Sequence, residues 1–272
     1  MATDGFTFEK FANNKFYQEQ NASLVDLTGV FPNQRIVDLA CGTGAVTRMI
    51  IERLRCAKNS VVIGIDHSAE MLKLAMEELK DVQTAAVQFA QGSIEQVSSV
   101  VKESVDTVFL CNAIHYVADK ERLLENISDS LKPGGKLAFN TSFFAGAHPP
   151  ETVAFARKWM LTSARHLRRE YGMFIIKSDK VESRKQLSCE EYTDLVQECG
   201  FNIEKSEIDT VAVPLEGWLD ISSFSDFILG AMPGVPLDKA SEALKAGVAR
   251  TFNELQVDFI PRNWLRIVAV KS

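Results

Sequence analysis

The stretch Val37-Asp-Leu-Ala-Cys-Gly-Thr-Gly44 decides the fold of this chain. It closes a short apolar, β-branched run, and a helical pattern begins after it near Ala45. Glycine at such a turn lets the backbone approach a ligand without a Cβ in the way, and the start of the next helix offers free N–H groups. The stretch therefore predicts a strand–turn–helix unit with a ligand at the turn.

Strand-like and helix-like segments alternate on both sides of this turn. Such alternation predicts a parallel sheet that helices cover on both faces, because parallel strands need crossover connections. The expected strands cover residues 35–39, 61–66, 87–91, 105–111, 136–141, 202–213 and 264–270. We therefore expect an α/β protein.

Three segments lie outside the alternation, at residues 1–30, 145–187 and 214–262. The second and third follow strands, and the ligand crevice of an open α/β sheet lies outside the carboxyl ends of its strands. We therefore expect one domain over residues 1–272, with these segments forming a helical lid.

The second lid segment contains one long predicted helix at residues 151–171. Its expected core stripe is Val153, Ala156, Met160 and Leu167, beside a neighbouring stripe of Phe155, Trp159 and Thr162. Its remaining face is basic, with Arg157, Lys158, Arg165, Arg168 and Arg169. Such a face is usually solvated, and the alternative is contact with an acidic substrate or an anionic surface.

Asp66 stands at the tip of the second expected strand, downstream of Gly44. A carboxylate at this place accepts hydrogen bonds from both hydroxyls of a ribose, which predicts a nucleoside site. Thr47 occupies the position where the dinucleotide fingerprint G-x-G-x-x-G has its third glycine. A pyrophosphate cradle is therefore the weaker interpretation.

Five motifs in order resemble those of the class I S-adenosylmethionine-dependent methyltransferases, in their small-molecule branch. They are residues 38–44, 64–72, 91–95, 106–116 and 132–135. Each motif alone is weak, but five at normal spacing are specific, and the resemblance covers about residues 35–200 and 264–271. It implies a Rossmann-like, seven-stranded, mostly parallel sheet with helices on both faces and helical lid insertions. It also implies S-adenosyl-L-methionine as cofactor and S-adenosyl-L-homocysteine as product.

The same resemblance implies a set of cofactor-binding residues. They are Asp38, Ala40, Gly42 and Gly44 around the methionine part, Asp66 and His67 at the ribose, Met71 (or Leu72), Ser93 and Ile94 around the adenine, and Cys111 and Asn112 under the sulfonium. Two positions depart from the family pattern. Ala40 replaces a glycine, which is harmless if its φ is negative, and Ser93 replaces the usual Asp, which removes a charge near the adenine.

Three residues are candidates on the substrate side: His115, Tyr17 and His148. His115 follows the fourth expected strand, close to where the resemblance places the methyl group. A histidine there can act as a general base for a phenol or an alcohol. The alternatives are that His115 only shapes the pocket and that His148 is a rigid loop residue.

The lid segments are rich in phenylalanine, which occurs 17 times in the chain. A pocket lined by these rings would be apolar. We therefore expect a small apolar or aromatic metabolite as acceptor, methylated at nitrogen or oxygen and less readily at carbon. Because the sulfonium is a good leaving group, positioning and desolvation for an in-line displacement would be the main catalytic effects.

Composition excludes several other classes of function. The formal net charge of −6 argues against a nucleic-acid surface. Five scattered cysteines without a C-x-x-C pair predict neither a metal site nor a disulfide framework, and they favour a cytoplasmic location. No apolar run is long enough to predict a signal peptide or a membrane span.

Two other functions remain as alternatives. A nicotinamide-dependent oxidoreductase would use the same crevice, but Thr47 and the lack of a clear Tyr-x-x-x-Lys pair oppose it. A non-catalytic, methyltransferase-like binding subunit is favoured only by Ser93. No pattern in the sequence indicates an oligomeric state.

Overall fold

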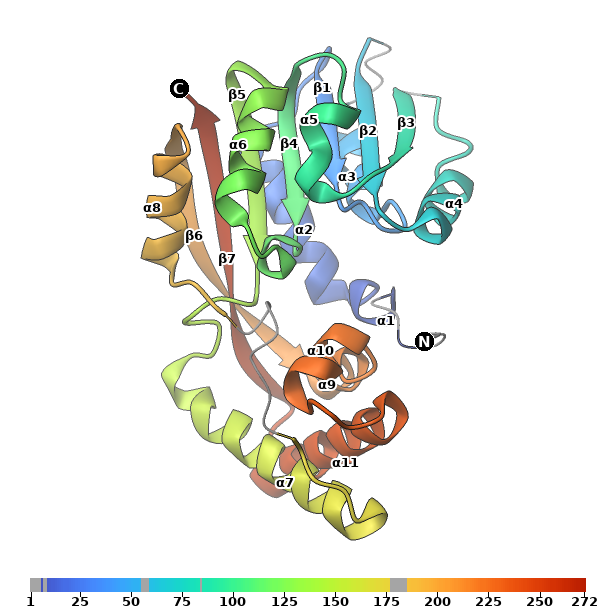
Figure 1. The fold of residues 1–272 in the computed structure, drawn as a ribbon, viewed down its shortest axis with the longest axis vertical. Helices are drawn as coiled ribbons and strands as arrows, with labels where there is room; N and C mark the ends of the chain where they lie inside the picture. The colour runs from blue at the N-terminus through green and yellow to red at the C-terminus, as the bar shows by residue number, and fades with distance from the viewer. Residues whose placement is uncertain (1–5, 7–8, 55–58, 84, 177–184) are drawn as a thin grey trace. The chain divides into compact units, whose positions relative to one another are not determined.

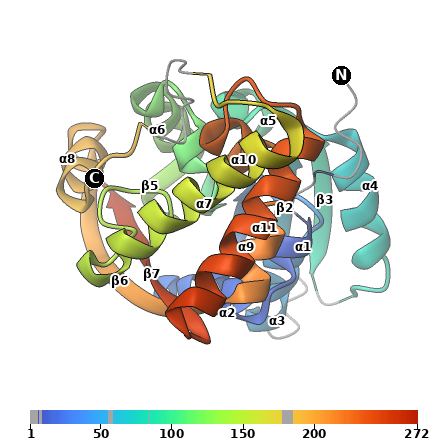
Figure 2. The same cartoon turned by 90° about the horizontal axis from the view of Figure 1, so that it is seen from below.

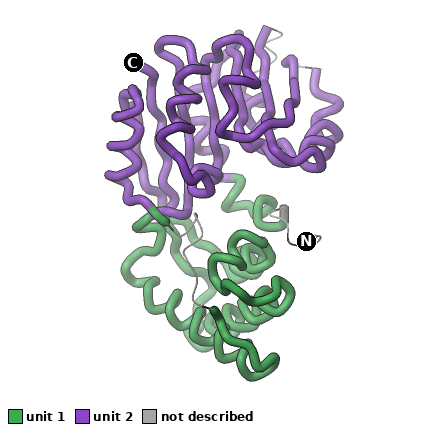
Figure 3. Tube along the Cα trace, viewed as in Figure 1, with its two compact units in different colours: residues 1–18, 145–186, 210–263 green, residues 19–144, 187–209, 264–272 purple. Residues whose placement is uncertain are grey.

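The computed structural model describes residues 6, 9–54, 59–83, 85–176 and 185–272. The chain divides into two compact units, shown in different colours in Figure 3. Unit 1 contains residues 1–18, 145–186 and 210–263, and unit 2 contains residues 19–144, 187–209 and 264–272. Unit 1 thus gathers most of the residues of the three segments that lie outside the predicted alternation. The lid function of these segments stays a prediction.

Unit 2 is built on a seven-stranded sheet with the order β3-β2-β1-β4-β5-β7-β6. The strands are β1 (Arg35–Leu39), β2 (Val61–Asp66), β3 (Ala86–Gln91), β4 (Val105–Cys111), β5 (Leu131–Thr141), β6 (Phe201–Pro214) and β7 (Phe259–Lys271). The pairs from β3 to β5 are parallel, and β7 runs antiparallel to β5. The predicted fold class, an α/β protein with a mostly parallel seven-stranded sheet, is confirmed.

Helices cover this sheet on both faces. They are α2 (Lys15–Thr28), α3 (Ala45–Arg53), α4 (Ala69–Glu78), α5 (Val97–Val100), α6 (Lys120–Ser130) and α8 (Cys189–Glu198), with the 3-10 turns η1 (Ile94–Gln96) and η2 (Ile114–Tyr116). In Figure 1, α5 and α6 lie in front of the strands, and α2 and α3 lie behind them. Because both faces are covered, the central strands read as continuous apolar runs instead of alternating ones.

The core of unit 2 lies where α2 and α3 pack on the central strands. Ile36 of β1, Val62 of β2 and Phe109 of β4 have no exposed surface, and Leu24 of α2 and Ile50 of α3 join the same cluster. Burying an aliphatic or aromatic side chain of this size contributes about 1.5–3 kcal/mol. This packing fixes the first two strand–turn–helix units, whose turns carry most of the predicted site.

Unit 1 consists mainly of helices. They are α1 (Glu9–Ala12), α7 (Val153–Tyr171), α9 (Leu215–Ile221), α10 (Ser225–Ala231) and α11 (Leu237–Leu255), with the 3-10 turn η3 (Pro150–Thr152). Helices α7 and α11 pack side by side, as Figure 2 shows. A Cβ at Gly247 would collide with Oγ of Ser163, so this glycine permits the close approach of the two helices.

The core stripe predicted for α7 is partly wrong. The buried residues are Phe155, Trp159, Thr162, Ser163 and Leu167, whereas Val153 is 40% exposed. The larger rings are inside because an aromatic side chain buries about 150–250 Å², more than valine or alanine can. Of the two adjacent apolar stripes on this helix, the aromatic one therefore faces the core.

Two strands begin five residues earlier than the sequence predicts. β5 begins at Leu131, which pairs with Val105 before a shift of register, although Pro133 and Gly134 suggested a turn as far as residue 135. β7 begins at Phe259 instead of residue 264. Among the described residues, no helix is long and apolar enough to span a membrane.

Candidate functional site

Asp66 joins the turns that follow the first two strands. Its Oδ2 accepts the backbone N–H of Gly42 at 2.9 Å, and its Oδ1 accepts the N–H of Ser68 at 2.9 Å. The residue is only 5% exposed. The carboxyl ends of β1 and β2 are therefore tied together by one carboxylate, whose remaining lone pairs can accept further donors.

The two glycines of the first turn have different structural roles. Gly44 has φ 86° and is the N-cap of α3, and a Cβ there would lie 3.2 Å from atoms of Ala75 and Leu79. Gly42 has φ 53°, and a Cβ there would meet nothing within 4 Å. Packing thus requires Gly44 to be small, whereas the space beside Gly42 is open and available to a ligand.

The condition under which Ala40 would be harmless is not met. Its φ is +62°, in the left-handed region that favours glycine. An L-residue in this conformation costs about 1–2 kcal/mol, because its Cβ crowds the following carbonyl. The glycine that the family usually has at this position would relieve that strain.

Asp38 lies beneath the same turn and is almost fully buried. Burial raises its pKa to about 7. The hydrogen bond of 2.6 Å that its Oδ2 accepts from Thr47 Oγ1 acts in the opposite direction but is the smaller effect. A cationic group beside Asp38 would favour the ionised form and lower this pKa. Asp38 is therefore suited to meet a positively charged part of a ligand.

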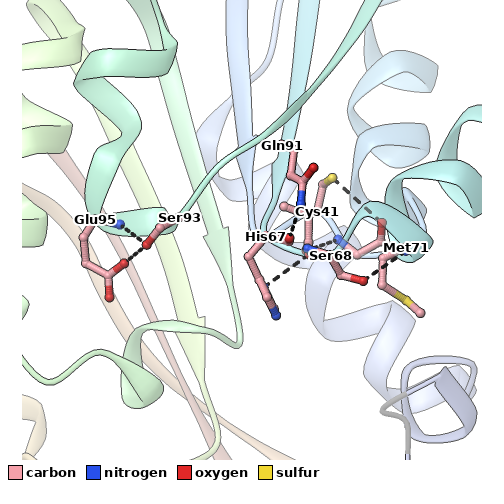
Figure 4. A network of polar contacts seen from close by, with 9 residues as sticks. Cys41, His67, Ser68, Met71, Gln91, Ser93 and Glu95 are labelled. Carbon is pink, nitrogen blue, oxygen red and sulfur yellow. Dashed lines mark hydrogen bonds and ion pairs between the residues drawn. The ribbon is translucent and has the colours of Figure 1, made fainter. Parts of the chain in front are cut away.

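Figure 4 shows the residues around the start of α4. Oγ of Ser68 accepts the N–H of Met71 at 3.3 Å and thereby caps the start of α4. Nε2 of Gln91 donates to the carbonyl oxygen of His67 at 3.0 Å. The His67 side chain is 84% exposed, with Nδ1 3.4 Å from Asp66 Oδ1. His67 thus borders the carboxylate from the solvent side, and Met71 is half-buried.

The charge missing at Ser93 is present two residues later. Oγ of Ser93 contacts the carboxylate of Glu95 and also accepts the Glu95 N–H at 3.4 Å (Figure 4). Ser93 and Ile94 are both half-buried at the start of η1. Glu95 was quoted within the third motif but was not predicted as a site residue, and an acid two positions after Ser93 was the signal that could have identified it.

Asn112 belongs to a buried network that the sequence did not predict. Its Nδ2 donates to Asn21 Oδ1 at 3.0 Å, and its Oδ1 accepts Trp264 Nε1 at 3.0 Å. Nδ2 of Asn140 donates to the same oxygen of Asn21 at 2.9 Å. These bonds hold Asn112 at φ 52°, directly after buried Cys111 at the end of β4. The backbone N–H of Asn112 donates to Asn140 Oδ1 at 2.9 Å, so its side chain and its N–H are both engaged with the protein.

His115 lies in η2, just beyond this network, and is 3% exposed. Its Nδ1 is 2.9 Å from Thr141 Oγ1, which also accepts the N–H of Phe143 at 3.0 Å. The imidazole stacks on Phe143 with ring centres 4.4 Å apart, and Tyr116 lies on it at 4.1 Å. Thr141 and the two rings therefore fix the orientation of His115.

The other two substrate-side candidates belong to unit 1. Tyr17 is buried and packs edge-on against Phe11, with ring centres 5.3 Å apart. Nε2 of His148 lies 3.3 Å from Nη1 of Arg262, and its ring is parallel to Trp218 at 6.3 Å. Because the guanidinium can only donate, this nitrogen of His148 is the acceptor.

All eleven predicted cofactor-binding residues lie in unit 2. They lie near the carboxyl ends of β1, β2, β3 and β4, which meet at one edge of the sheet. Five further residues contact members of this set, namely Thr47, Glu95, Asn21, Asn140 and Trp264, and Thr141 contacts His115; none of these six was predicted as a site residue. Within the described residues, no group of three His, Cys, Asp or Glu side chains could hold a metal ion.

Comparison with known proteins identifies the family. The model of a family described as "Methyltransferase domain" matches residues 31–183, more than half of the chain. The trans-aconitate 2-methyltransferase of Deinococcus radiodurans is 32% identical over 46% of this chain. The matched region spans 45% of that relative, so the chain matches less than half of its length.

Solved structures share the fold. The YcgJ protein of Bacillus subtilis has a TM-score of 0.59 and 14% identity, covering 93% of this chain and 98% of its own. Phosphoethanolamine N-methyltransferase 2 of Haemonchus contortus, solved with S-adenosyl-L-methionine, has a TM-score of 0.57 and 21% identity, covering 99% of this chain and 57% of its own. Together with the match to the family model, the motifs on this fold show that the chain belongs to the class I S-adenosylmethionine-dependent methyltransferases.

Proposed function

We propose that this chain transfers a methyl group from S-adenosyl-L-methionine to a nitrogen or oxygen atom of a small molecule. The observation that carries the proposal is the tie between Asp66 and Gly42, which places a carboxylate with free lone pairs beside open space at a glycine turn. The ordered motifs and the family assignment support the same activity.

The residues present fit this cofactor. Open space at Gly42 can receive its methionine part without a clash, and Asp66 can accept hydrogen bonds from the ribose hydroxyls. Asp38, buried beside the turn, would favour the cationic amino group of the methionine part. Ser93 with Glu95 would face the adenine amino group, since a carboxylate and a hydroxyl both accept from it.

The bound cofactor supplies an activated methyl group on a sulfonium, which is also the leaving group. The protein's part is to align the acceptor and exclude water, because an in-line displacement needs little else. His115 is the residue we assign to the acceptor's proton. Its Nδ1 is engaged by Thr141, so Nε2 is the ring atom assigned to receive that proton.

A small apolar or aromatic acceptor remains our proposal for the substrate. The rings of Phe143 and Tyr116 beside His115 support it, since an apolar wall favours such ligands. The named substrate of the Deinococcus radiodurans relative, trans-aconitate, makes a carboxylate oxygen an alternative target atom. The four described cysteines are free thiols, which supports a cytoplasmic location.

The test is binding of S-adenosylhomocysteine against NADH and NADPH, followed by turnover. At a ligand concentration about 100 times Kd, specific binding adds about 2.7 kcal/mol and raises Tm. We expect stabilisation by S-adenosylhomocysteine alone, then methyl transfer to at least one member of a panel of amines, phenols and carboxylic acids. Stabilisation by a nicotinamide instead would favour the oxidoreductase. Cofactor binding without transfer to any acceptor would favour a binding subunit.

A further inference from the structure

A groove in unit 1 has no part in the site described above. It lies between α7 and α11, has a volume of about 570 Å³, and contains none of the predicted cofactor-binding or substrate-side residues. Both helices belong to unit 1, and Figure 2 shows them side by side. The groove therefore needs an explanation of its own.

The lining of this groove is strongly basic. Among the described residues, it carries five cationic side chains and one acid: Arg157, Lys158, Arg165, Arg169, Arg250 and Glu254. These formal charges sum to +4 in a chain whose net charge is −6. Positive charge is thus concentrated in one recess, which raises the local concentration of anions there.

The single acid in the groove is already neutralised. Glu254 forms ion pairs with Lys158 at 2.9 Å and with Arg250 at 2.7 Å. Hydrogen bonds from these two cations lower the pKa of Glu254 to about 2, so it stays ionised and paired. Glu254 therefore does not compete for the remaining arginines.

Two of those arginines have no acidic partner among the described residues. Arg157 and Arg165 are exposed on the same face of α7 and form no ion pair there, whereas Arg169 pairs with Glu170 at 2.6 Å. Arg157 and Arg165 are eight residues apart, which is about 12 Å along a helix. A ligand with one anionic group would reach one of them, and a ligand with several would bridge both.

The chemistry of the lining favours phosphate groups. Four of the five cations are arginines, whose planar guanidinium groups bind phosphate oxygens in pairs. No described Phe, Tyr or Trp lines the groove, so stacked bases are not what it would recognise.

We propose that the α7–α11 groove binds a ligand carrying several phosphate groups, either a free oligophosphate or the phosphorylated headgroup of a lipid. Leu161, 58% exposed between Arg157 and Arg165, would contact the apolar part of a lipid. This site is independent of the methyl-transfer site and of the activity proposed for it.

The test uses the full chain, with inorganic tripolyphosphate as the first probe and isothermal titration calorimetry as the readout. We expect saturable binding that weakens as NaCl rises from 50 to 250 mM, because the cations are exposed to screening. The double variant Arg157→Gln/Arg165→Gln should bind at least tenfold more weakly. Arg168→Gln, on the same helix but outside the groove lining, is the matched control and should bind within twofold of wild type.

A second arm separates the two sources of phosphate. Vesicles containing phosphatidylinositol bisphosphate are compared with pure phosphatidylcholine vesicles by cosedimentation. Tighter binding to the former than to tripolyphosphate assigns a lipid headgroup, and the reverse assigns a free oligophosphate. The absence of saturable binding in both arms, or equal binding by the double variant and wild type, would overturn the proposal. All substitutions are at exposed side chains, and circular dichroism checks that each variant is folded.

Discussion

The backbone N–H of Gly42 donates a hydrogen bond of 2.9 Å to Oδ2 of Asp66, which joins the turn after β1 to the end of β2. Oδ1 of the same carboxylate accepts the N–H of Ser68 and thereby fixes the start of α4. One side chain thus shapes both turns and offers its remaining lone pairs to a ligand. Replacing Asp66 therefore loosens both turns and also removes acceptors for a ligand.

Replacing Asp66 should weaken binding of S-adenosylhomocysteine. We expect Asp66→Ala to raise Kd at least tenfold, equivalent to about 1.4 kcal/mol, and Asp66→Asn to have a smaller effect because one acceptor oxygen remains. Calorimetric titration measures Kd. Asp119→Ala is the control: Asp119 caps α6 by accepting the N–H of Arg122 at 3.0 Å, so its loss should lower stability but not affinity. Unchanged Kd in Asp66→Ala would contradict the cofactor site.

Replacing Ala40 by glycine should stabilise the protein. The φ of +62° costs alanine about 1–2 kcal/mol, and glycine removes this strain. Glycine also raises the conformational entropy of the unfolded chain, which offsets part of the stabilisation. We expect the free energy of unfolding to rise by about 0.5–1 kcal/mol in urea denaturation. Ala22→Gly, inside helix α2, should instead lower it by about 1 kcal/mol. A destabilised Ala40→Gly would show that the left-handed backbone is not strained.

Asp38 should make stability depend on pH. Burial raises its folded-state pKa to about 7, whereas the unfolded carboxyl titrates near 3.8. Between these values the folded state holds a proton that the unfolded state has lost, so the contribution of Asp38 to stability is greatest at low pH and falls as pH rises from about 4 to 7. Asp38→Asn cannot titrate, and its stability relative to wild type should therefore increase over this range.

Urea unfolding at several pH values between 4 and 8 measures this effect. Asp129→Asn, at an exposed position of α6, is the control and should follow the wild-type curve. If the bound methionine part lowers the pKa of Asp38, S-adenosylhomocysteine should release a proton near pH 6.5. Titrations in buffers of different ionisation enthalpy detect that proton.

His115 and Thr141 should affect turnover more than cofactor affinity. We expect His115→Ala to lower kcat at least tenfold, since a general base contributes about 10²–10⁴-fold, with Kd for S-adenosylhomocysteine within twofold of wild type. Thr141→Val removes the hydroxyl that orients the imidazole and should shift the pH profile of kcat. Thr107→Val, at a buried position of β4, is the matched control. If His115→Ala leaves kcat and Kd unchanged, the role of His115 is structural.

Asn21 should be important for stability. Its Oδ1 accepts amide hydrogens from both Asn112 and Asn140, and all three residues are buried. In Asn21→Ala both donors lose this acceptor, and each buried unsatisfied group costs about 1–3 kcal/mol. We expect a loss of about 2–4 kcal/mol in chemical denaturation. Asn202→Ala, at an exposed position, should change stability by less than about 0.5 kcal/mol. A similar small change in Asn21→Ala would contradict the importance of the network.

Features that depend on local sequence were predictable. Buried parallel strands appear as short apolar runs, and the ends of β1, β2 and β4 agree with those runs. The capping box of α8 is a feature of the same kind, because Ser188 and Glu191, three residues apart, form both of its bonds. Glycines and caps act within a few residues, so the sequence contains their whole signal.

Features that depend on tertiary contact were not predictable. Nothing near Asn112 in the sequence indicates that Asn21 and Trp264 hold its side chain, since both come from distant segments. The backbone angle of Ala40 is likewise not indicated by its neighbours in the sequence; in the structure the next residue, Cys41, donates its N–H to the carbonyl oxygen of Ile65 in β2 at 3.0 Å. The buried stripe of α7 was decided by competition between two apolar faces, which only the packing against α11 resolves.

The position of β7 determines when the sheet can be completed. β7 lies between β5 and β6, so β6 is connected to the other strands only through a strand that the ribosome makes after all of them. Trp264 at this strand also supplies the indole N–H that holds Asn112. During synthesis, the turn after β4 therefore lacks one of its anchors until β7 has been inserted, so this part of the predicted site is assembled only at that late step.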